Sequence, residues 1–260
     1  MMRIATTLVE PVHDLASAWQ QFRWHHPEWT LAVVVIAAWL ALFASADKVG
    51  GGPTAAIGAH THHGVQRAGQ FGHDPPMAAA HWVLMVVAMM LLTILPAARF
   101  ISLSGRWERR QRGPALFAIG YLSVWIALGL IAFGVVQWAA PHLQSRWMVA
   151  AALGVAAVWE LTIWKLRFLR ACHRMRPIPP DGWKADCSVV MRGLRNAASC
   201  VGACWAMMAP MMFAGHVAAM WLMGPITLAI AMDKFAAKPK KVVRPVAAGL
   251  AALAILTTIW

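Results

Sequence analysis

Charged side chains are scarce in this chain of 260 residues: they make up 13% of the composition, whereas hydrophobic residues make up 60%. A soluble domain carries roughly 25% charged residues, so the composition excludes an ordinary soluble protein. The apolar runs are continuous and do not alternate at every second residue, which excludes a transmembrane β-barrel. We therefore predict an all-α protein, a polytopic bundle of transmembrane helices.

The sequence also lacks the motifs of soluble enzymes. It has no glycine-rich phosphate-binding loop, no helical H-E-x-x-H zinc motif, and no nucleophile elbow that would bring Ser, His and Asp together. These absences argue against a hydrolase of the soluble type and favour a protein that is not an enzyme. A membrane-embedded metalloenzyme stays open as an alternative.

Acidic residues are few, with 10 Asp and Glu against 23 Lys and Arg, and the formal net charge is +13. Such an excess in a soluble protein suggests nucleic acid, but here the basic residues cluster between apolar runs. Clusters of this kind control membrane topology and contact anionic lipid headgroups. We therefore expect the lipid bilayer, and no nucleic acid, as the partner of these charges.

Cysteine is rare. The four residues are Cys172, Cys187, Cys200 and Cys204. Their spacing fits no disulfide framework, and none of them lies in a segment that we place outside the membrane. We expect no structural disulfide.

Seven apolar runs are long enough, at about 18 residues or more, to cross a hydrocarbon core of roughly 30 Å. They cover residues 29–46, 79–101, 115–138, 147–168, 197–214, 217–235 and 243–260. The pair Gly215-His216 favours a tight turn between the fifth and sixth runs over one continuous helix. Lys and Arg follow the second, fourth and sixth runs, so the positive-inside rule predicts an N-terminus inside and a C-terminus outside.

Residues 1–28 form a separate predicted segment, followed by a transmembrane domain over residues 29–260. Three tryptophans of the first segment and its border fit an amphipathic helix at the membrane interface: Trp19, Trp24 and Trp29. The tripeptide ASA at 44–46 resembles a signal-peptidase site, but the long polar region before it favours a retained anchor.

The predicted outward loop 47–78 is rich in histidine. It holds His60, His62, His63, His73 and Asp74, and two further histidines, His81 and His216, lie on the same predicted side. Neutral imidazole binds copper, zinc and nickel, and an irregular loop can bring several such ligands together. We expect an outer metal site here, with a solvated loop that has no defined site as the alternative.

A stripe of sulfur residues follows the fifth run. Cys200, Cys204, Met207, Met208 and Met211 recur at i, i+4, i+7, i+8 and i+11, which aligns them on one helical face. Met85 and Met89 repeat the i, i+4 spacing on the second run. Thiolate and thioether are soft donors that select Cu(I). The alternative is packing, because methionine is an adaptable filler of helix interfaces.

Two polar groups near the membrane leave alternatives open. Glu160 is costly inside a span, and either a salt bridge to a nearby basic residue or a role in proton or ion coupling explains it. Asp233, beside Lys234, is expected at the interface. Cys172-His173, with Asp186 and Cys187 downstream, offers a second metal site on the inner side.

Several segments together carry a family likeness. WELTIWKLRFLRACHR (159–174), MRGLRNAASCVGACWAMM (191–208) and HWVLMVVAMMLLTILP (81–96), with GYLSVW (120–125) and MDKF (232–235), resemble the DUF2182 family. That resemblance implies a predicted metal-binding integral membrane protein of the bacterial cytoplasmic (inner) membrane. The family pattern has further sulfur or imidazole positions where this chain has Phe168 and Ala171, and a Cys pair in place of Ala203-Cys204.

These observations favour a metal-handling membrane protein, with copper as the first choice of metal and zinc as the second. We expect histidine and methionine to bind the ion at the outer face. The ion then passes to a partner, such as a metallochaperone or a membrane enzyme complex, or across the bilayer. The alternative is a non-catalytic accessory subunit of a membrane enzyme complex, whose methionine-rich faces pack against partner helices.

Overall fold

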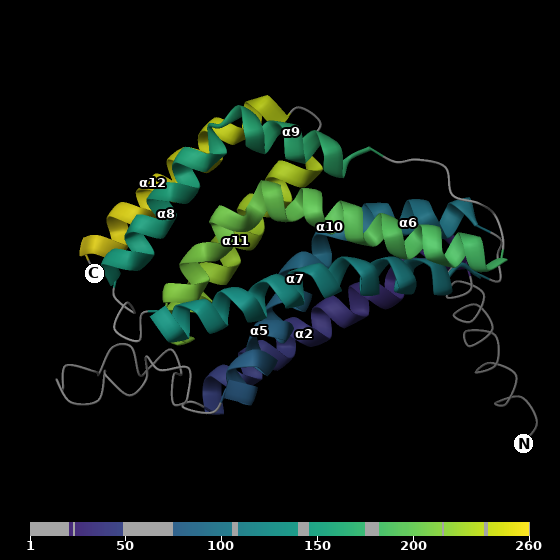
Figure 1. Ribbon diagram of the computed structural model, residues 1–260, viewed down its shortest axis with the longest axis horizontal. Coiled ribbons are helices and arrows are strands. Elements are labelled where there is room, and N and C mark those ends of the chain that lie inside the picture. Colours follow the sequence, from purple (N-terminus) through teal and green to yellow (C-terminus); the bar gives the residue numbers. More distant parts are fainter. Residues whose placement is uncertain are drawn as a thin grey trace, which may run out of the picture.

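The computed structural model is a helical bundle (Figure 1). It describes residues 21–22, 24–48, 75–105, 109–139, 146–174, 182–214, 216–236 and 239–259. Its helices are α2 (Trp29–Lys48), α5 (Pro75–Met90), η1 (Leu92–Ile94), α6 (Leu95–Ser104), α7 (Arg112–Ala139), α8 (Arg146–Glu160), α9 (Ile163–Cys172), α10 (Gly182–Phe213), α11 (His216–Phe235) and α12 (Pro239–Ile259). The all-α prediction is confirmed for this part of the chain. Each apolar run satisfies its backbone hydrogen bonds within itself, as a membrane span must.

The two longest helices, α7 and α10, pack against each other through the centre of the bundle (Figure 1). A Cβ atom built on Gly120 would lie 2.6 Å from the carbonyl oxygen of Val190, and one built on Gly193 would lie 2.4 Å from that of Phe117. Small residues allow this close approach of membrane helices. We call Gly120 and Gly193 the glycine seam; it places Tyr121 directly beside α10.

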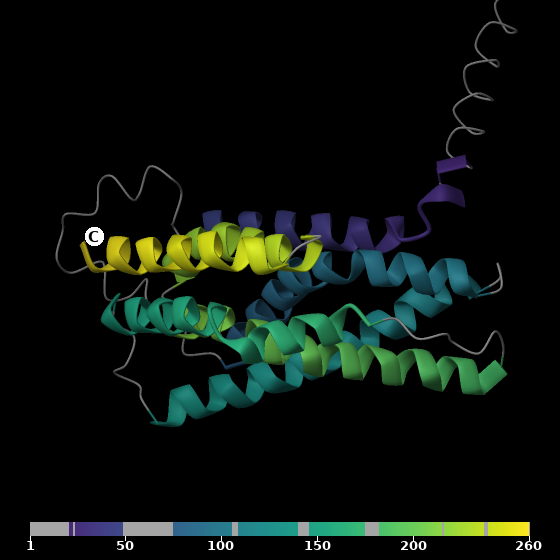
Figure 2. The same ribbon diagram turned by 90° about the horizontal axis from the view of Figure 1, so that it is seen from above.

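Two further helix pairs flank this centre. Helix α12 packs mainly along α8, and α2 packs along α5 (Figures 1 and 2). The indole of Trp39 on α2 donates a hydrogen bond to the carbonyl of Ala88 on α5, at 3.2 Å. Helix α10 also contacts α8, α9 and α11, so its side chains meet groups from most of the bundle.

The predicted span 147–168 is wrong as one continuous helix. The chain breaks after Glu160, and α8 and α9 meet at an angle of 75°. Thr162 is the N-cap of α9: its backbone is extended and its hydroxyl accepts a hydrogen bond from the amide of Lys165. Threonine is a favourable N-cap, so the sequence ends one helix and begins another here.

Helix α10 begins at Gly182, well before the predicted start at residue 197. The added turns are amphipathic, because buried residues recur every fourth position at Ala185, Val189, Gly193 and Ala197. The turn predicted near Gly215 is confirmed, since α10 and α11 are separate helices.

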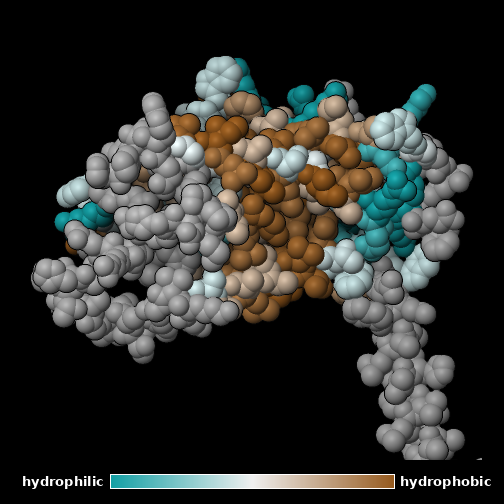
Figure 3. Space-filling view, turned by 60° about the horizontal axis from the view of Figure 1, so that its bottom comes forward, coloured by the Kyte–Doolittle hydropathy of each residue, from teal (hydrophilic) through white to brown (hydrophobic). Residues whose placement is uncertain are grey.

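Three helical stretches of the described residues are long and apolar enough to cross a membrane: Ala79–Ser104, Arg112–Ala132 and Lys240–Ile259. The bent pair α8 and α9 makes a fourth if both halves form one span. Figure 3 shows a broad band of hydrophobic residues next to hydrophilic ones, the surface that a bilayer requires. These helices fit a membrane protein; the full count of seven spans stays a prediction.

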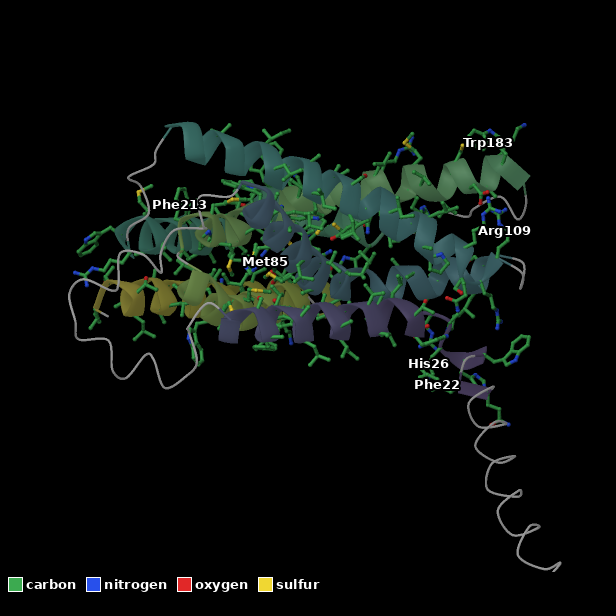
Figure 4. The ribbon with its side chains drawn as sticks, turned by 90° about the horizontal axis from the view of Figure 1, so that it is seen from below. Phe22, His26, Met85, Arg109, Trp183 and Phe213 are labelled. Atoms are coloured by element: carbon green, nitrogen blue, oxygen red, sulfur yellow. The ribbon has the colours of Figure 1, made fainter. Side chains whose placement is uncertain are left out.

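One end of the bundle holds a group of charged side chains. Arg109, Trp183 and His26 lie at one end, and Phe213 lies at the other (Figure 4). At the first end Arg109 pairs with Asp186, and Arg112 reaches the same carboxylate at 2.8 Å. Basic residues at one end are what the positive-inside rule leads us to expect, but which end faces the cytoplasm stays a prediction.

Candidate metal centre

The predicted sulfur stripe faces the interior of the bundle. Its five members are between 0% and 3% exposed: Cys200, Cys204, Met207, Met208 and Met211. Met85 and Met89 of α5 are equally buried, and all seven belong to one hydrophobic core (Figure 4). These methionines pack within the chain itself, so they do not form the partner-binding surface that an accessory subunit would need.

Cys200 is the centre of a polar group inside this core. Cys204 lies one helical turn further along α10 and is also fully buried. The hydroxyl of Tyr121 on α7 donates a hydrogen bond to the sulfur of Cys200 at 2.9 Å. The Tyr121 oxygen also lies 3.3 Å from the hydroxyl of Thr93 on η1 and 4.0 Å from the sulfur of Met90.

A lysine completes this group. The ammonium of Lys234 donates to the hydroxyl of Thr93 at 2.9 Å and to that of Tyr121 at 3.4 Å, and the same Tyr121 hydroxyl contacts the sulfur of Cys200. We call the set Thr93, Tyr121, Cys200, Cys204 and Lys234 the thiol cluster. It joins residues from η1, α7, α10 and α11 (Figure 1).

The prediction that Lys234 belongs to a basic cytoplasmic loop is therefore wrong. Helix α11 continues to Phe235, and the side chain of Lys234 turns into the bundle, where the residue is only 8% exposed. The long aliphatic stem of a lysine lets its charged head reach away from its own backbone. Here the side chain of Lys234 points inward, toward the thiol cluster.

A second buried group lies around Lys165 of α9. Its ammonium pairs with the carboxylates of Glu160 and Asp233, and all three residues are 0% exposed. We call this set the carboxylate cluster. The salt-bridge interpretation of Glu160 is confirmed. The interfacial position expected for Asp233 is wrong, because α9 brings Lys165 against it and buries both.

The histidine part of the predicted metal site falls mainly outside the described residues: His60, His62, His63, His73 and Asp74. His216 begins α11, and its side chain is also outside what the structure describes. His81 lies on α5, four residues before Met85. Among the described residues, no three His, Cys, Asp or Glu side chains are placed to share a metal ion.

The inner residues proposed as a second metal site have other contacts. Both ring nitrogens of His173 lie 2.7 Å from backbone carbonyl oxygens, those of Leu169 and Lys234. Asp186 pairs with two arginines at the end of the bundle, and the exposed Cys187 lies on α10 beside it. Cys172 is partly buried and packs against the hydrophobic core that contains Cys200.

Sequence reasoning missed Thr93, Tyr121, Lys165 and Lys234 as site residues. Periodicity finds sulfur on a helical face, but it does not reveal that a lysine at the end of another helix turns inward. A usable signal was the family likeness, because its segments 81–96, 120–125, 159–174 and 232–235 contain all four residues.

Comparison with known families agrees with the contents of this core. The sequence profile of the PpoB2 family, described as copper chaperones, matches residues 79–257, well over half of the chain. The chain belongs to this family. The matched residues include the whole thiol cluster and the whole carboxylate cluster, and they begin just after the predicted loop 47–78. The description of the PpoB2 family agrees with copper as the first choice of metal. The DUF2182 name itself stays a prediction.

No curated protein and no solved structure matches the chain.

Proposed function

We propose that this member of the PpoB2 family is a membrane-embedded copper chaperone that holds Cu(I) on Cys200 and Cys204 and passes it to a partner protein. One observation carries this proposal: two fully buried thiols, one helical turn apart on one face of α10. They lie within the residues that the family profile matches. Burial in this core keeps competing water and oxygen ligands away from the sulfur atoms.

The donors of the thiol cluster suit a soft cation. Thiolate and thioether sulfur select Cu(I), whereas hard cations prefer oxygen. Zinc, the second metal that we expected, takes four ligands in structural sites. Two cysteines without a third His, Cys, Asp or Glu, as found among the described residues, are too few for that. Cu(I) tolerates fewer ligands, so copper fits these residues better than zinc.

A path to the thiol cluster completes the proposal. His60, His62, His63, His73, Asp74 and His216 capture the ion at the outer face. On α5, His81, Met85 and Met89 recur every fourth residue and so follow one helical face toward the core. Buried thioethers continue on α10 at Met207, Met208 and Met211.

The proposed setting is the bacterial inner membrane, crossed several times, with the N-terminus inside and the C-terminus outside. The apolar helices of the described residues support the membrane part of this proposal. The receiving partner is a metallochaperone or a copper-dependent membrane enzyme complex. Residues 1–28 lie along the membrane interface, and residues 29–260 form the membrane domain.

Copper binding by the purified full-length chain in detergent tests the function. Under reducing conditions we expect about one tightly bound Cu(I) per chain, with a sulfur-to-copper charge-transfer band. The double variant Cys200→Ser with Cys204→Ser should lose that band and the tightly bound ion. Cys187→Ser is the matched control, because Cys187 is exposed. A double variant that binds copper as tightly as the wild type contradicts the proposal.

A further inference from the structure

The two buried lysines of the core are neutralised in different ways. Lys165 contacts two carboxylates, from Glu160 and Asp233. Lys234 donates hydrogen bonds to two hydroxyls, and one of them, that of Tyr121, in turn contacts the sulfur of Cys200. The ion pairs of the described residues assign Lys234 no carboxylate. A buried charge without a counter-charge is costly. The groups around Lys234 that can supply a negative charge are the cysteines.

The charge of a loaded thiol pair explains this arrangement. When Cu(I) binds two thiols, two protons leave, two copper–sulfur bonds form, and no electron is transferred. The product, one unipositive ion on two thiolates, carries a single negative charge. A divalent ion on the same two thiolates gives a neutral product. Only the cuprous complex therefore needs a single positive partner in this core.

We propose that Lys234 is the counter-cation of a cuprous dithiolate on Cys200 and Cys204, and that it makes the site selective for a monovalent soft cation. This inference rests on the proposed function. The inference names the residue that makes the site prefer an ion of one charge over an ion of another.

The geometry fits this role. Thr93 and Tyr121 hold the ammonium of Lys234, at 2.9 Å and 3.4 Å, so that it lies one hydroxyl away from the sulfur of Cys200. Tyr121 also donates to the sulfur of Cys200. Hydrogen bonds to an ionised acceptor are stronger than those between neutral groups. The same contacts that orient the ammonium therefore stabilise the negative sulfur atoms of the loaded site.

The arrangement also disfavours divalent cations. With Zn²⁺ or Cd²⁺ on the two thiolates, the ammonium of Lys234 would stay as an uncompensated charge in the core. The ion pairs of Glu160 and Asp233 in the described residues are made with Lys165 and not with Lys234. Selection by charge thus adds to the selection by softness that any sulfur site provides.

Replacement of Lys234 tests the inference. Competition with chromophoric chelators gives the affinities of the detergent-solubilised full-length protein for Cu(I) and for Cd²⁺. We expect Lys234→Met to weaken Cu(I) binding on the order of a hundredfold, as for the loss of a nearby unit charge in a partly polar interior. Binding of Cd²⁺ should stay the same or strengthen. Lys234→Arg, which keeps the charge, should recover most of the Cu(I) affinity.

The matched control is Lys184→Met, because Lys184 is an exposed lysine of α10; it should leave both affinities unchanged. If Lys234→Met does not fold, Lys234→Gln replaces it, since the amide can still donate to Thr93. Equal Cu(I) affinity in the wild type and the neutral variants overturns the inference. So does an equal loss for Cu(I) and Cd²⁺. Failure of the proposed function looks different, because then the wild type itself holds no copper on the two cysteines.

Discussion

The carboxylate cluster and the thiol cluster both contain a buried lysine, contributed by α9 and by α11. Their partners differ in kind. Around Lys165 the negative charges are permanent parts of the chain, from Glu160 and Asp233. Around Lys234 the neighbours are hydroxyls and thiols, which gain a full negative charge by losing protons, as the cysteines do to a bound metal. Lys165 therefore belongs to the scaffold, and Lys234 is the lysine to which our proposal assigns a response to bound metal.

The largest effect is expected from the scaffold lysine. Lys165→Met leaves two buried carboxylates without their cation, and loss of one partner from a buried ion pair costs about 3–5 kcal/mol. Thermal or denaturant unfolding in detergent should show that loss. The triple variant that adds Glu160→Gln and Asp233→Asn should recover most of it, since no unpaired charge remains. The control is Arg170→Met, which removes an exposed basic side chain from the same helix. If Lys165→Met is no less stable than Arg170→Met, the difference between the two clusters is refuted.

A medium effect is expected at the glycine seam, which positions Tyr121 for the thiol cluster. Gly193→Ala adds a methyl group that would lie 2.4 Å from the carbonyl oxygen of Phe117. Overpacking of this kind costs about 1–3 kcal/mol. The forced separation of α7 from α10 should also lengthen the contact between Tyr121 and Cys200 and so weaken Cu(I) binding several-fold.

The control for the seam is Gly249→Ala on α12, where an added Cβ atom meets nothing within 4 Å. That change should be neutral or stabilise the helix by up to about 1 kcal/mol. Unfolding and Cu(I) competition, measured on both variants, separate crowding at the seam from a general response to alanine. If Gly193→Ala matches the control in both measurements, the seam does not position the site.

The smallest effect is expected at the charged end of the bundle. Asp186 pairs with Arg109 and Arg112, and the side chain of Arg112 is 68% exposed. Ion pairs near water contribute about 0–1 kcal/mol and weaken with salt. Asp186→Asn should therefore lower the free energy of unfolding slightly at low ionic strength and hardly at all at high ionic strength. A loss as large as that of Lys165→Met would show that this pair is buried in the membrane protein as it exists in detergent.

Much of the helical layout followed from the sequence. Long apolar runs, the turn near Gly215 and the common face of Cys200, Cys204 and the α10 methionines depend on local pattern and helical period alone. The break at Thr162 was missed, because an N-cap inside a long apolar run interrupts the helix without interrupting the hydrophobicity. The early start of α10 was missed because its first turns are amphipathic rather than apolar.

The polar core could not be predicted from local pattern. The sequence suggests charges at the membrane surface for three residues near the ends of predicted spans: Lys165, Asp233 and Lys234. Their burial depends on which helices meet, and that depends on contacts between residues far apart in the chain, such as Lys234 with Thr93. The sulfur residues could be predicted because they share one face of a single helix. The positive charge near them could not, because Lys234 comes from another helix.

The glycine seam also makes the two sides of the thiol pair differ in how far they can deform. Gly193 lies two turns before Cys200 on α10, and there backbone meets backbone with no side chain able to move aside. On the other side of the cysteines, toward Phe213, α10 is lined by Met207, Met208 and Met211. Unbranched thioethers change rotamer easily. On the side of Gly193, rigid backbone packs against α7, whereas on the side of Phe213 the neighbours of the cysteines are side chains that can change shape.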